Sequence, residues 1–453
     1  MTTRRQFPAD FRWGVAAAAY QIEGAVNEDG RGPSIWDTFS HTPGRTHGGD
    51  TGDVAADHYH RFEEDVTLMA GLGVNAYRFS ISWSRLLPDG FGDVNPAGVE
   101  FYRRLCERLL ETGITPVATL YHWDLPQALQ DLGGWLDVRS ATWFAEYSTV
   151  AKERLGDLVT VWSTLNEPWC SAFLGHSSGE HAPGLTDPGS GLVAAHNLML
   201  AHHRGIAALR ATATRPEDEL GVVLNLIPAW PATDSEADRR AASAVDLVHN
   251  RLFADAAFHG RYPDGVLELH ERYQVADVID VDELAGVRAD IDYLGVNYYN
   301  INHIAHAPGA PALAAWPGAD EAVIATPPGH LTEMGWGVEP EGLSWMLRRI
   351  VKEYPAIPIM ICENGAAYPD VVGPDGIVDD PLRIAYLEAH IEATADAIDA
   401  GVEVTGYFVW SFCDNFEWSL GYDKRFGLIR VDYETLDRAV KASGHWYRTF
   451  LAS

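Results

Sequence analysis

Two short motifs in the sequence place a glutamate directly after an apolar run. They are Thr164-Leu165-Asn166-Glu167-Pro168 and Ile361-Cys362-Glu363-Asn364-Gly365. A charge that leaves water must be compensated, so a carboxylate at the end of a buried strand needs a reason other than packing. Two such carboxylates can cleave a glycosidic bond if the fold brings them together: one protonates the leaving oxygen while the other attacks or activates water. The elements around them decide whether they meet.

Strand-like apolar runs recur along the whole chain, and most of them are followed by an amphipathic helical pattern. Many of the runs lack polar alternation, which is typical of parallel strands buried on both faces. Strand–helix alternation without a linker predicts a single (β/α)8 TIM barrel that spans residues 1–453 as one catalytic domain. The expected strands cover residues 11–15, 75–81, 115–121, 159–164, 221–226, 293–298, 357–362 and 404–410.

Two segments interrupt this rhythm. Residues 175–191 and 306–329 are rich in Gly, Pro and Ala and show no periodicity. Long loops in a compact domain are usually functional or mobile. Both segments follow strands that end in polar residues, so we expect long loops around the carboxyl-terminal face of the barrel.

The composition narrows the possible partners and the compartment. The formal net charge is −31, which disfavours nucleic acid, anionic membranes and phosphorylated substrates. No apolar run reaches the length of a membrane span, and the basic amino-terminal residues have no apolar stretch behind them, so we expect neither membrane insertion nor a secretory signal. The four cysteines are scattered without a C-x-x-C pair. We therefore expect a cytoplasmic protein with a neutral small-molecule ligand. The oligomeric state stays open.

Polar side chains gather at the carboxyl ends of the expected strands, where active sites of this barrel lie. They combine amides, an imidazole, carboxylates and indoles with very few lysines. Sugars need this mixture, because their hydroxyls bind planar bidentate partners and their C–H faces stack on aromatic rings. In chain order these residues are Gln21, Arg78, His122, Asn166, Glu167, Asn297, Tyr299, Glu363, Trp410, Glu417 and Trp418.

The ordered set of motifs resembles family 1 of the glycoside hydrolases, the β-glucosidase family. The similarity runs from residue 11 to about residue 450. A lone Asn-Glu-Pro would be a weak signal, whereas the complete series in family order is a specific one. The matching segments are Phe11-Arg-Trp-Gly-Val-Ala-Ala-Ala-Ala-Tyr-Gln-Ile-Glu-Gly24, Tyr121-His-Trp-Asp-Leu-Pro126, Thr164–Pro168, Gly295-Val-Asn-Tyr-Tyr299, Thr332-Glu-Met-Gly-Trp336, Glu363-Asn-Gly365 and Trp410-Ser-Phe-Cys-Asp-Asn-Phe-Glu-Trp418.

The resemblance implies a role for each matched residue. Glu167 would be the general acid/base and Glu363 the nucleophile of a retaining double displacement, with Arg78 keeping Glu363 ionised. Tyr299 would orient Glu363, and Asn297 would lie between sugar and nucleophile. The residues expected to bind the sugar are Gln21, His122, Asn166, Glu417 and Trp418 through hydroxyls, Trp410 as a platform and Trp336 on the leaving-group side. In such a double displacement Glu167 gives up a proton in the first step and takes one back in the second, which needs no metal and no cofactor.

The resemblance also indicates the substrate. Family members that act on 6-phosphorylated sugars replace the Glu417-Trp418 pair, and a carboxylate there would repel phosphate. Thioglucosidases of the family carry Gln at the acid/base position, whereas this chain has Glu167. We therefore expect a β-glucosidase that releases terminal non-reducing β-D-glucosyl residues, with galactosyl and fucosyl residues as further substrates, from oligosaccharides or aryl glycosides. Cys362 stands where the family usually has Thr, a departure that leaves the reaction intact.

Three alternatives stay open at this point. A transglycosylase would use the same two glutamates and differ only in its acceptor. A non-catalytic sugar-binding protein is disfavoured because both glutamates are retained. A metal-dependent barrel hydrolase is conceivable with 18 histidines. However, the His58-x-His60 pair and the adjacent His202-His203 fall in helical patterns rather than at strand ends.

Overall fold

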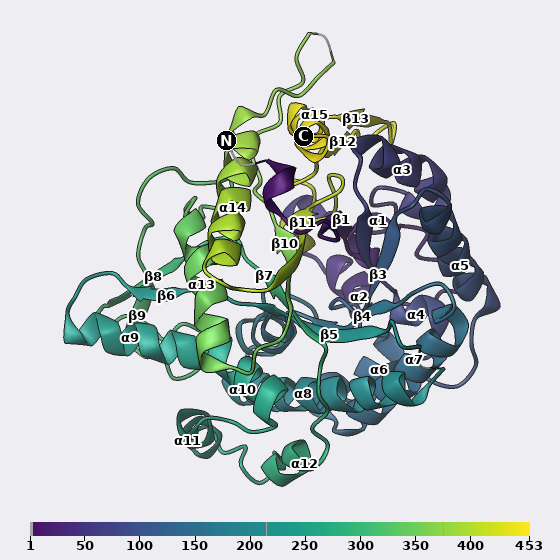
Figure 1. The fold of residues 1–453 in the computed structure, drawn as a ribbon. Helices are drawn as coiled ribbons and strands as arrows, with labels where there is room; N and C mark the ends of the chain where they lie inside the picture. The colour runs from purple at the N-terminus through teal and green to yellow at the C-terminus, as the bar shows by residue number, and fades with distance from the viewer. Residues whose placement is uncertain (1–2, 214, 375) are drawn as a thin grey trace.

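Eight parallel strands close into a barrel in the computed structural model, which describes residues 3–213, 215–374 and 376–453 (Figure 1). Residues 1 and 2 of the expected domain lie outside the described residues. Around the barrel the strands follow the order β1-β11-β10-β7-β5-β4-β3-β2. The strands are β1 (Arg12–Ala17), β2 (Ala76–Ser80), β3 (Thr115–Tyr121), β4 (Val161–Asn166), β5 (Glu219–Asn225), β7 (Tyr293–Asn297), β10 (Ile359–Asn364) and β11 (Val404–Trp410). Each matches an expected strand to within two residues at either end, which confirms the TIM barrel.

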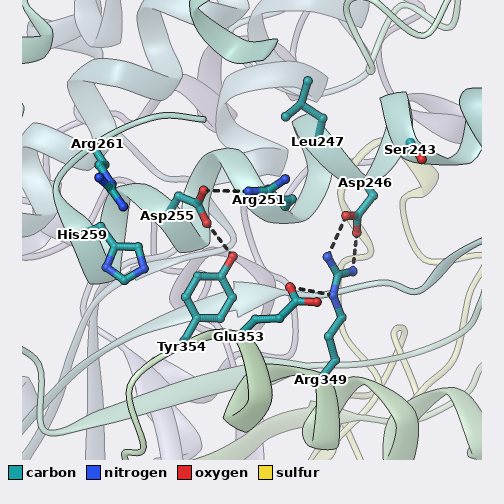
Figure 2. A pocket seen from close by; sticks show the side chains of 10 residues that line it. All are labelled: Ser243, Asp246, Leu247, Arg251, Asp255, His259, Arg261, Arg349, Glu353 and Tyr354. Atoms are coloured by element: carbon teal, nitrogen blue, oxygen red, sulfur yellow. Dashed lines mark hydrogen bonds and ion pairs between the residues drawn. The ribbon is translucent and has the colours of Figure 1, made fainter. Parts of the chain in front are cut away.

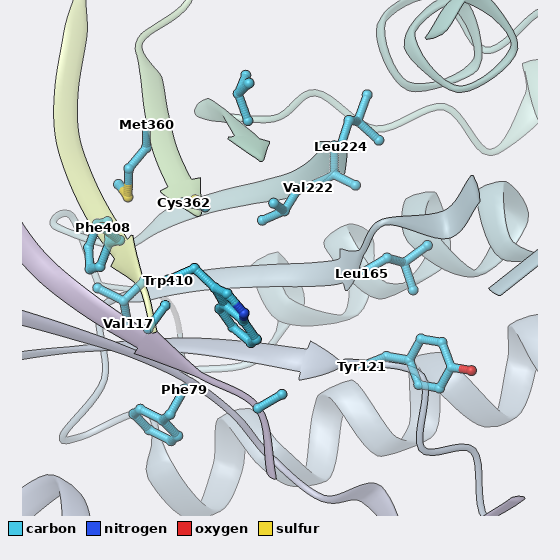
Figure 3. Packing of buried hydrophobic residues seen from close by; sticks show 14 of the residues in the cluster. Phe79, Val117, Tyr121, Leu165, Val222, Leu224, Met360, Cys362, Phe408 and Trp410 are labelled. Atoms are coloured by element: carbon cyan, nitrogen blue, oxygen red, sulfur yellow. The ribbon is translucent and has the colours of Figure 1, made fainter. Parts of the chain in front are cut away.

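The barrel interior is filled by large apolar side chains. Every residue of β2, β4, β7 and β10 is buried, which explains why these strands read as continuous apolar runs. Figure 3 shows Met360 and Phe408 among these packed side chains. The ring of Phe408 fits because β1 carries Gly14, where a Cβ would lie 2.3 Å from Phe408 Cδ1.

Helices surround the barrel (Figure 1), and the longer ones bury an apolar face. On α5, for example, Tyr102, Leu105 and Leu109 are fully buried, and the Asn95 side chain caps the first turn by accepting from Ala97 N. The helices are α1 (Ala19–Ile22), α2 (Ile35–Ser40), α3 (His58–Leu72), α4 (Trp83–Leu86), α5 (Pro96–Glu111), α6 (Gln127–Gln130), α7 (Arg139–Leu155), α8 (Pro188–Ala211), α9 (Glu236–Asp246), α10 (Leu252–His259), α11 (Asp264–Arg272), α12 (Val281–Gly286), α13 (Pro340–Glu353), α14 (Pro381–Asp399) and α15 (Ala442–Leu451).

The two segments expected to be loops contain more regular structure than their sequence indicates. The chain winds as a π-helix over Cys170–Ser178, and α8 already begins at Pro188, so only the middle of 175–191 is irregular. Within 306–329, β9 (Ala322–Ile324) pairs antiparallel with β8 (Asn302–His306), which in turn pairs with β6 (Ala229–Pro231). The small apolar side chains of this segment pack into a satellite core, which explains the missing periodicity. A last pair, β12 (Ile429–Val431) with β13 (Arg438–Val440), follows the barrel.

The histidine pairs weighed as metal ligands lie on helices, as expected: His58 and His60 on α3, and His202 and His203 on α8. Among residues 3–213, 215–374 and 376–453, no cluster of three or more His, Cys, Asp or Glu side chains is arranged to hold a metal ion. The four cysteines are buried and unpaired. In the same residues, none of the helices combines the length and the apolarity that crossing a bilayer requires.

Candidate active site

The carboxyl ends of the strands open into a cavity of about 340 Å³. Asn166 ends β4 and Glu167 directly follows it, Glu363 is the last residue but one of β10, and Trp410 ends β11. Nine of the twelve predicted site residues line the cavity: His122, Glu167, Asn297, Tyr299, Trp336, Glu363, Trp410, Glu417 and Trp418. The other three, Gln21, Arg78 and Asn166, are almost fully buried behind this lining.

The Glu363 carboxylate is held by a buried cation and a phenol. Arg78 Nη1 donates to Oε1 at 2.6 Å and Tyr299 OH donates to Oε2 at 2.7 Å. The pKa of Glu363 is raised above its usual value by burial, and the Arg78 charge and the Tyr299 hydrogen bond limit this rise. A buried ion pair with both oxygens satisfied keeps this carboxyl in its charged form.

The Glu167 carboxyl has a different environment. Asn297 Nδ2 donates to Oε1 at 2.6 Å, and Cys170 Sγ donates to Oε2 at 3.1 Å. Within the described part of the chain, Glu167 forms no ion pair. Burial, followed by the negative charge of Glu363, raises the pKa of Glu167 to about 8. Of the two carboxyls, Glu167 is therefore the one that holds a proton at neutral pH.

A short network of amides connects the two carboxyls. Asn166 Oδ1 accepts from Arg78 Nη2 at 2.6 Å and from Asn297 Nδ2 at 3.0 Å. Because the guanidinium can only donate, the Asn166 amide is oriented with its Nδ2 towards His122 Nε2, 3.0 Å away. His122 then accepts at Nε2 and is neutral, in line with a pKa that burial and the nearby Arg78 charge lower well below its usual value.

A polar and aromatic wall faces the two carboxyls. Gln21 Nε2 donates to Phe416 O at 2.9 Å and lies 3.4 Å from Glu417 Oε2, while Gln21 Oε1 is buried without a partner among the described residues. Burial, then the charges of Glu363 and Glu167, raise the pKa of Glu417 to about 8. The rings of Trp410 and Trp418 each stack near His122, with centroids 5.9 Å away. Amide, carboxyl and indole groups are thus exposed to one cavity, as a sugar site requires.

Backbone strain accompanies the site. Glu167 has a φ of 47°, Trp123 of 76° and Trp418 of 52°, all in the left-handed region that residues with a Cβ rarely adopt. Strain of this kind clusters at functional sites, where it aims side chains that relaxed backbone would not. Directly after β10, the backbone at Gly365 lies very close to the end of β11. A Cβ at this position would be 1.7 Å from Trp410 O, so only glycine fits there.

Sequence reasoning missed part of the lining. The additional residues come from loops, from the π-helix and from β5. Trp123 and Met334 lie within the matching segments but were given no role, Trp169 directly follows one of these segments, and the others have no motif signal. Cys170 is the closest of the missed residues to a carboxyl. The set includes Trp123, Trp169, Cys170, Leu174, Glu180, His181, Asn225, Ile227, Met334 and Phe426.

A larger hollow of about 650 Å³ lies outside the barrel, between α9–α10 and α13 (Figure 2). Its charges neutralise one another: Arg349 pairs with Asp246 at 2.5 Å and with Glu353 at 3.1 Å. Asp255 accepts from Tyr354 OH at 2.6 Å. This hollow is open to solvent and its carboxylates are compensated, so it lacks the perturbed acid pair of the barrel mouth.

Comparison with known proteins agrees with this geometry. Glycosyl hydrolase family 1 matches residues 3–453. "Beta-glucosidase A" of Thermotoga maritima is 48% identical over 444 residues, covering 98% of this chain and 97% of that protein. A "Bifunctional beta-D-glucosidase/beta-D-fucosidase" of Bifidobacterium breve is 46% identical, covering 98% of each chain. The solved family 1 β-glucosidase of Thermotoga maritima superposes with a TM-score of 0.93 at 47% identity, covering 98% of each chain, and it has also been solved in complex with glucoimidazole. The chain belongs to glycosyl hydrolase family 1.

Proposed function

We propose that this protein is a retaining β-glucosidase that hydrolyses terminal, non-reducing β-D-glucosyl residues of oligosaccharides and aryl glycosides. The observation that carries the proposal is the pair of buried carboxyls in one cavity with unequal surroundings. Glu363 has a cation at 2.6 Å, whereas the donors to Glu167 among the described residues are all neutral. The names of the relatives support glucosides, and the Bifidobacterium breve relative supports fucosides as further substrates.

In the first half-reaction, Glu363 acts as the nucleophile. Its carboxylate attacks the anomeric carbon, and Glu167 gives its proton to the departing glycosidic oxygen. The alcohol leaves and a glycosyl ester forms on Glu363. The Tyr299 hydroxyl bonds Oε2, so Arg78 and Tyr299 together fix the plane of the attacking carboxylate.

In the second half-reaction, Glu167 acts as the base. Once Glu363 is an ester its negative charge is gone, and that charge is the second largest cause of the raised pKa of Glu167. The pKa of Glu167 therefore falls just when a carboxylate is needed. Glu167 takes a proton from water, the water attacks the anomeric carbon, and Glu363 is released. The sugar keeps its β configuration after two inversions, and neither step calls for a metal or a cofactor.

The remaining residues hold the sugar. Gln21, His122, Asn166, Glu417 and Trp418 bind hydroxyls, Trp410 is the platform, and Trp336 lies on the leaving-group side. The unpartnered Oε1 of buried Gln21 supports a hydroxyl donor from a ligand at this point. No Lys or Arg is among the described residues that line the cavity, so a phosphate group would find no cation there, and we propose unphosphorylated sugars as substrates.

We propose that residues 1–453 act as one catalytic domain in the cytoplasm on a small-molecule glycoside. A family match over residues 3–453 supports a single unit. The four buried, unpaired cysteines are what a reducing compartment favours.

Replacing the nucleophile tests the proposal. Glu363→Ala should lose nearly all hydrolysis of an aryl β-glucoside, and added azide should restore part of the rate by entering the vacated space. The product should then be α-glucosyl azide, because only one inversion has occurred. Wild-type turnover in Glu363→Ala would overturn the assignment, and so would rescue that yields the β-azide.

A further inference from the structure

The carboxyl of Glu167 has a second hydrogen-bond donor besides Asn297, a thiol that the motifs do not include. Cys170 lies three residues beyond Glu167, at the start of the π-helix, and its Sγ is 3.1 Å from Glu167 Oε2. The side chain is 5% exposed and lines the cavity. Cys170 N also donates to Glu167 O at 2.9 Å, so backbone and side chain both tie this turn to the carboxyl.

Several hydrogen bonds fix the surroundings of the thiol on the side away from Glu167. Asn225 Nδ2 lies 3.6 Å from Cys170 Sγ, and His249 Nε2 is 2.9 Å from Asn225 O. Trp316 Nε1 donates to His249 Nδ1 at 3.1 Å, which fixes the proton of this imidazole on Nε2. The His249 bond thus holds the main-chain carbonyl of Asn225 at the end of β5, and the Asn225 amide in turn donates to the thiol beside Glu167. Because the sulfur accepts from Asn225, its own hydrogen is free to point at the carboxyl.

We propose that Cys170 is a positioning residue for Glu167: its S–H, oriented by Asn225, donates to Oε2 and favours the carboxylate form that acts as base in the second half-reaction. The inference rests on the proposed role of Glu167 as acid/base. It adds a donor on Oε2 that complements the Asn297 donor on Oε1.

A thiol suits a group that must change its protonation state twice in each cycle. Burial, followed by the charge of Glu167, raises the pKa of Cys170 well above its usual value, so the thiol keeps its proton throughout the cycle. S–H is a weak donor. It stabilises the carboxylate moderately and costs little when Glu167 is protonated and the bond is lost. A hydroxyl would stabilise the carboxylate more strongly.

The other groups that face Glu167 stay in place when Cys170 is changed. They are the Glu363 and Glu417 carboxyls, the Arg78 guanidinium, the Tyr299 hydroxyl and the Asn297 amide. Around the thiol itself, the charges are those of Glu167, Glu363 and Glu180. A shift in the titration of Glu167 in a Cys170 variant can therefore be assigned to the lost or altered donor.

The test is the pH dependence of kcat/KM for 4-nitrophenyl β-glucoside, whose basic limb reports the protonated acid of the free enzyme. A hydrogen bond to a charged group is worth about one pKa unit, and a thiol less. Cys170→Ala removes the donor, so the pKa of Glu167 rises and the basic limb should move up by about half a unit. Cys170→Ser supplies a stronger donor and should move the limb below its wild-type position. Cys106→Ala, a buried thiol on α5, is the matched control and should leave the limb unchanged.

Opposite shifts in the Ala and Ser variants support the proposal. An unmoved limb in Cys170→Ser, or a limb that moves equally in Cys106→Ala, overturns it, even if Cys170→Ala does not fold. A loss of kcat without any displacement of the limb would show that Cys170 only packs. Glu167→Gln separates this inference from the proposed function: its basic limb should disappear, and a retained limb would remove the assigned role of Glu167 itself.

Discussion

Arg78 and Glu363 form a buried ion pair at the centre of the site, and the substitution Arg78→Met removes its positive charge. Both side chains are buried, with exposed fractions of 1% and 4%. Removing one partner of a buried pair costs about 3–5 kcal/mol, because the other charge is left uncompensated. At about 1.4 kcal/mol per pKa unit, the pKa of Glu363 would rise by about two to four units. Towards the upper end of this range most of the nucleophile would be neutral at pH 7, and kcat/KM should fall about 10-fold or more from the lost ionisation alone.

The same substitution makes stability depend on pH in a defined direction. With its folded-state pKa raised above an unfolded value of about 4.3, Glu363 binds a proton in the folded variant that the unfolded chain releases. Stability relative to the wild type is therefore lost as pH rises from the folded-state pKa of Glu363 in the wild type, itself raised by burial, towards the higher folded-state pKa in the variant. Denaturant unfolding at pH 5 and pH 8 should show the smaller deficit at pH 5.

A surface pair provides the control. Arg240 and Glu236 form an ion pair with exposed fractions of 68% and 79%, so Arg240→Met should change stability by no more than about 0.5 kcal/mol and leave the rate unchanged. A stability deficit of Arg78→Met that is the same at both pH values would refute the reasoning. Near wild-type turnover of that variant at pH 7 would do so too, because it would mean that Glu363 ionises without the guanidinium.

Two further predictions concern the acid and the backbone of the site. Glu167→Ala should spare aryl glucosides with good leaving groups but lose about 10²–10⁴-fold on those with poor ones, since only the latter need the proton; equal losses in a leaving-group series would contradict this. The wild-type basic limb should lie near pH 8, where Glu167 loses its proton. Gly365→Ala should destabilise the fold by several kcal/mol, measured as melting temperature and soluble yield, because its Cβ would meet Trp410 O. Gly71→Ala, with no atom within 4 Å of the new Cβ, should not destabilise α3, and similar losses in both variants would refute the steric argument.

The barrel was predictable because its strands are buried on both faces and therefore read as unbroken apolar runs. The residues at the mouth were predictable because the carboxyl ends of parallel strands meet at one face. Glu167 and Glu363 were found from this rule alone, before any family resemblance. The pairing of Arg78 with Glu363 and of Tyr299 with the same carboxylate needed the resemblance, and the structure shows both contacts.

The sequence could not reveal contacts between residues that are far apart in the chain and meet only in the folded barrel. Cys170 and Asn225 come together because β4 and β5 are adjacent in the barrel, and no local pattern records that adjacency. Trp316 reaches His249 from a segment that lacks periodicity and was expected to be only a loop. The hydrogen bond from the Asn297 amide to Glu167, at 2.6 Å, was also not foreseen, because it is set by side-chain rotamers rather than by spacing.

Identifying which anomer of glucose forms first is the most direct test of a double displacement on Glu363. Proton NMR of wild-type hydrolysis of an aryl β-glucoside should show β-glucose appearing first, with the α anomer growing only at the rate of mutarotation. If α-glucose appears first, the reaction is a single displacement, and Glu363 cannot be the nucleophile.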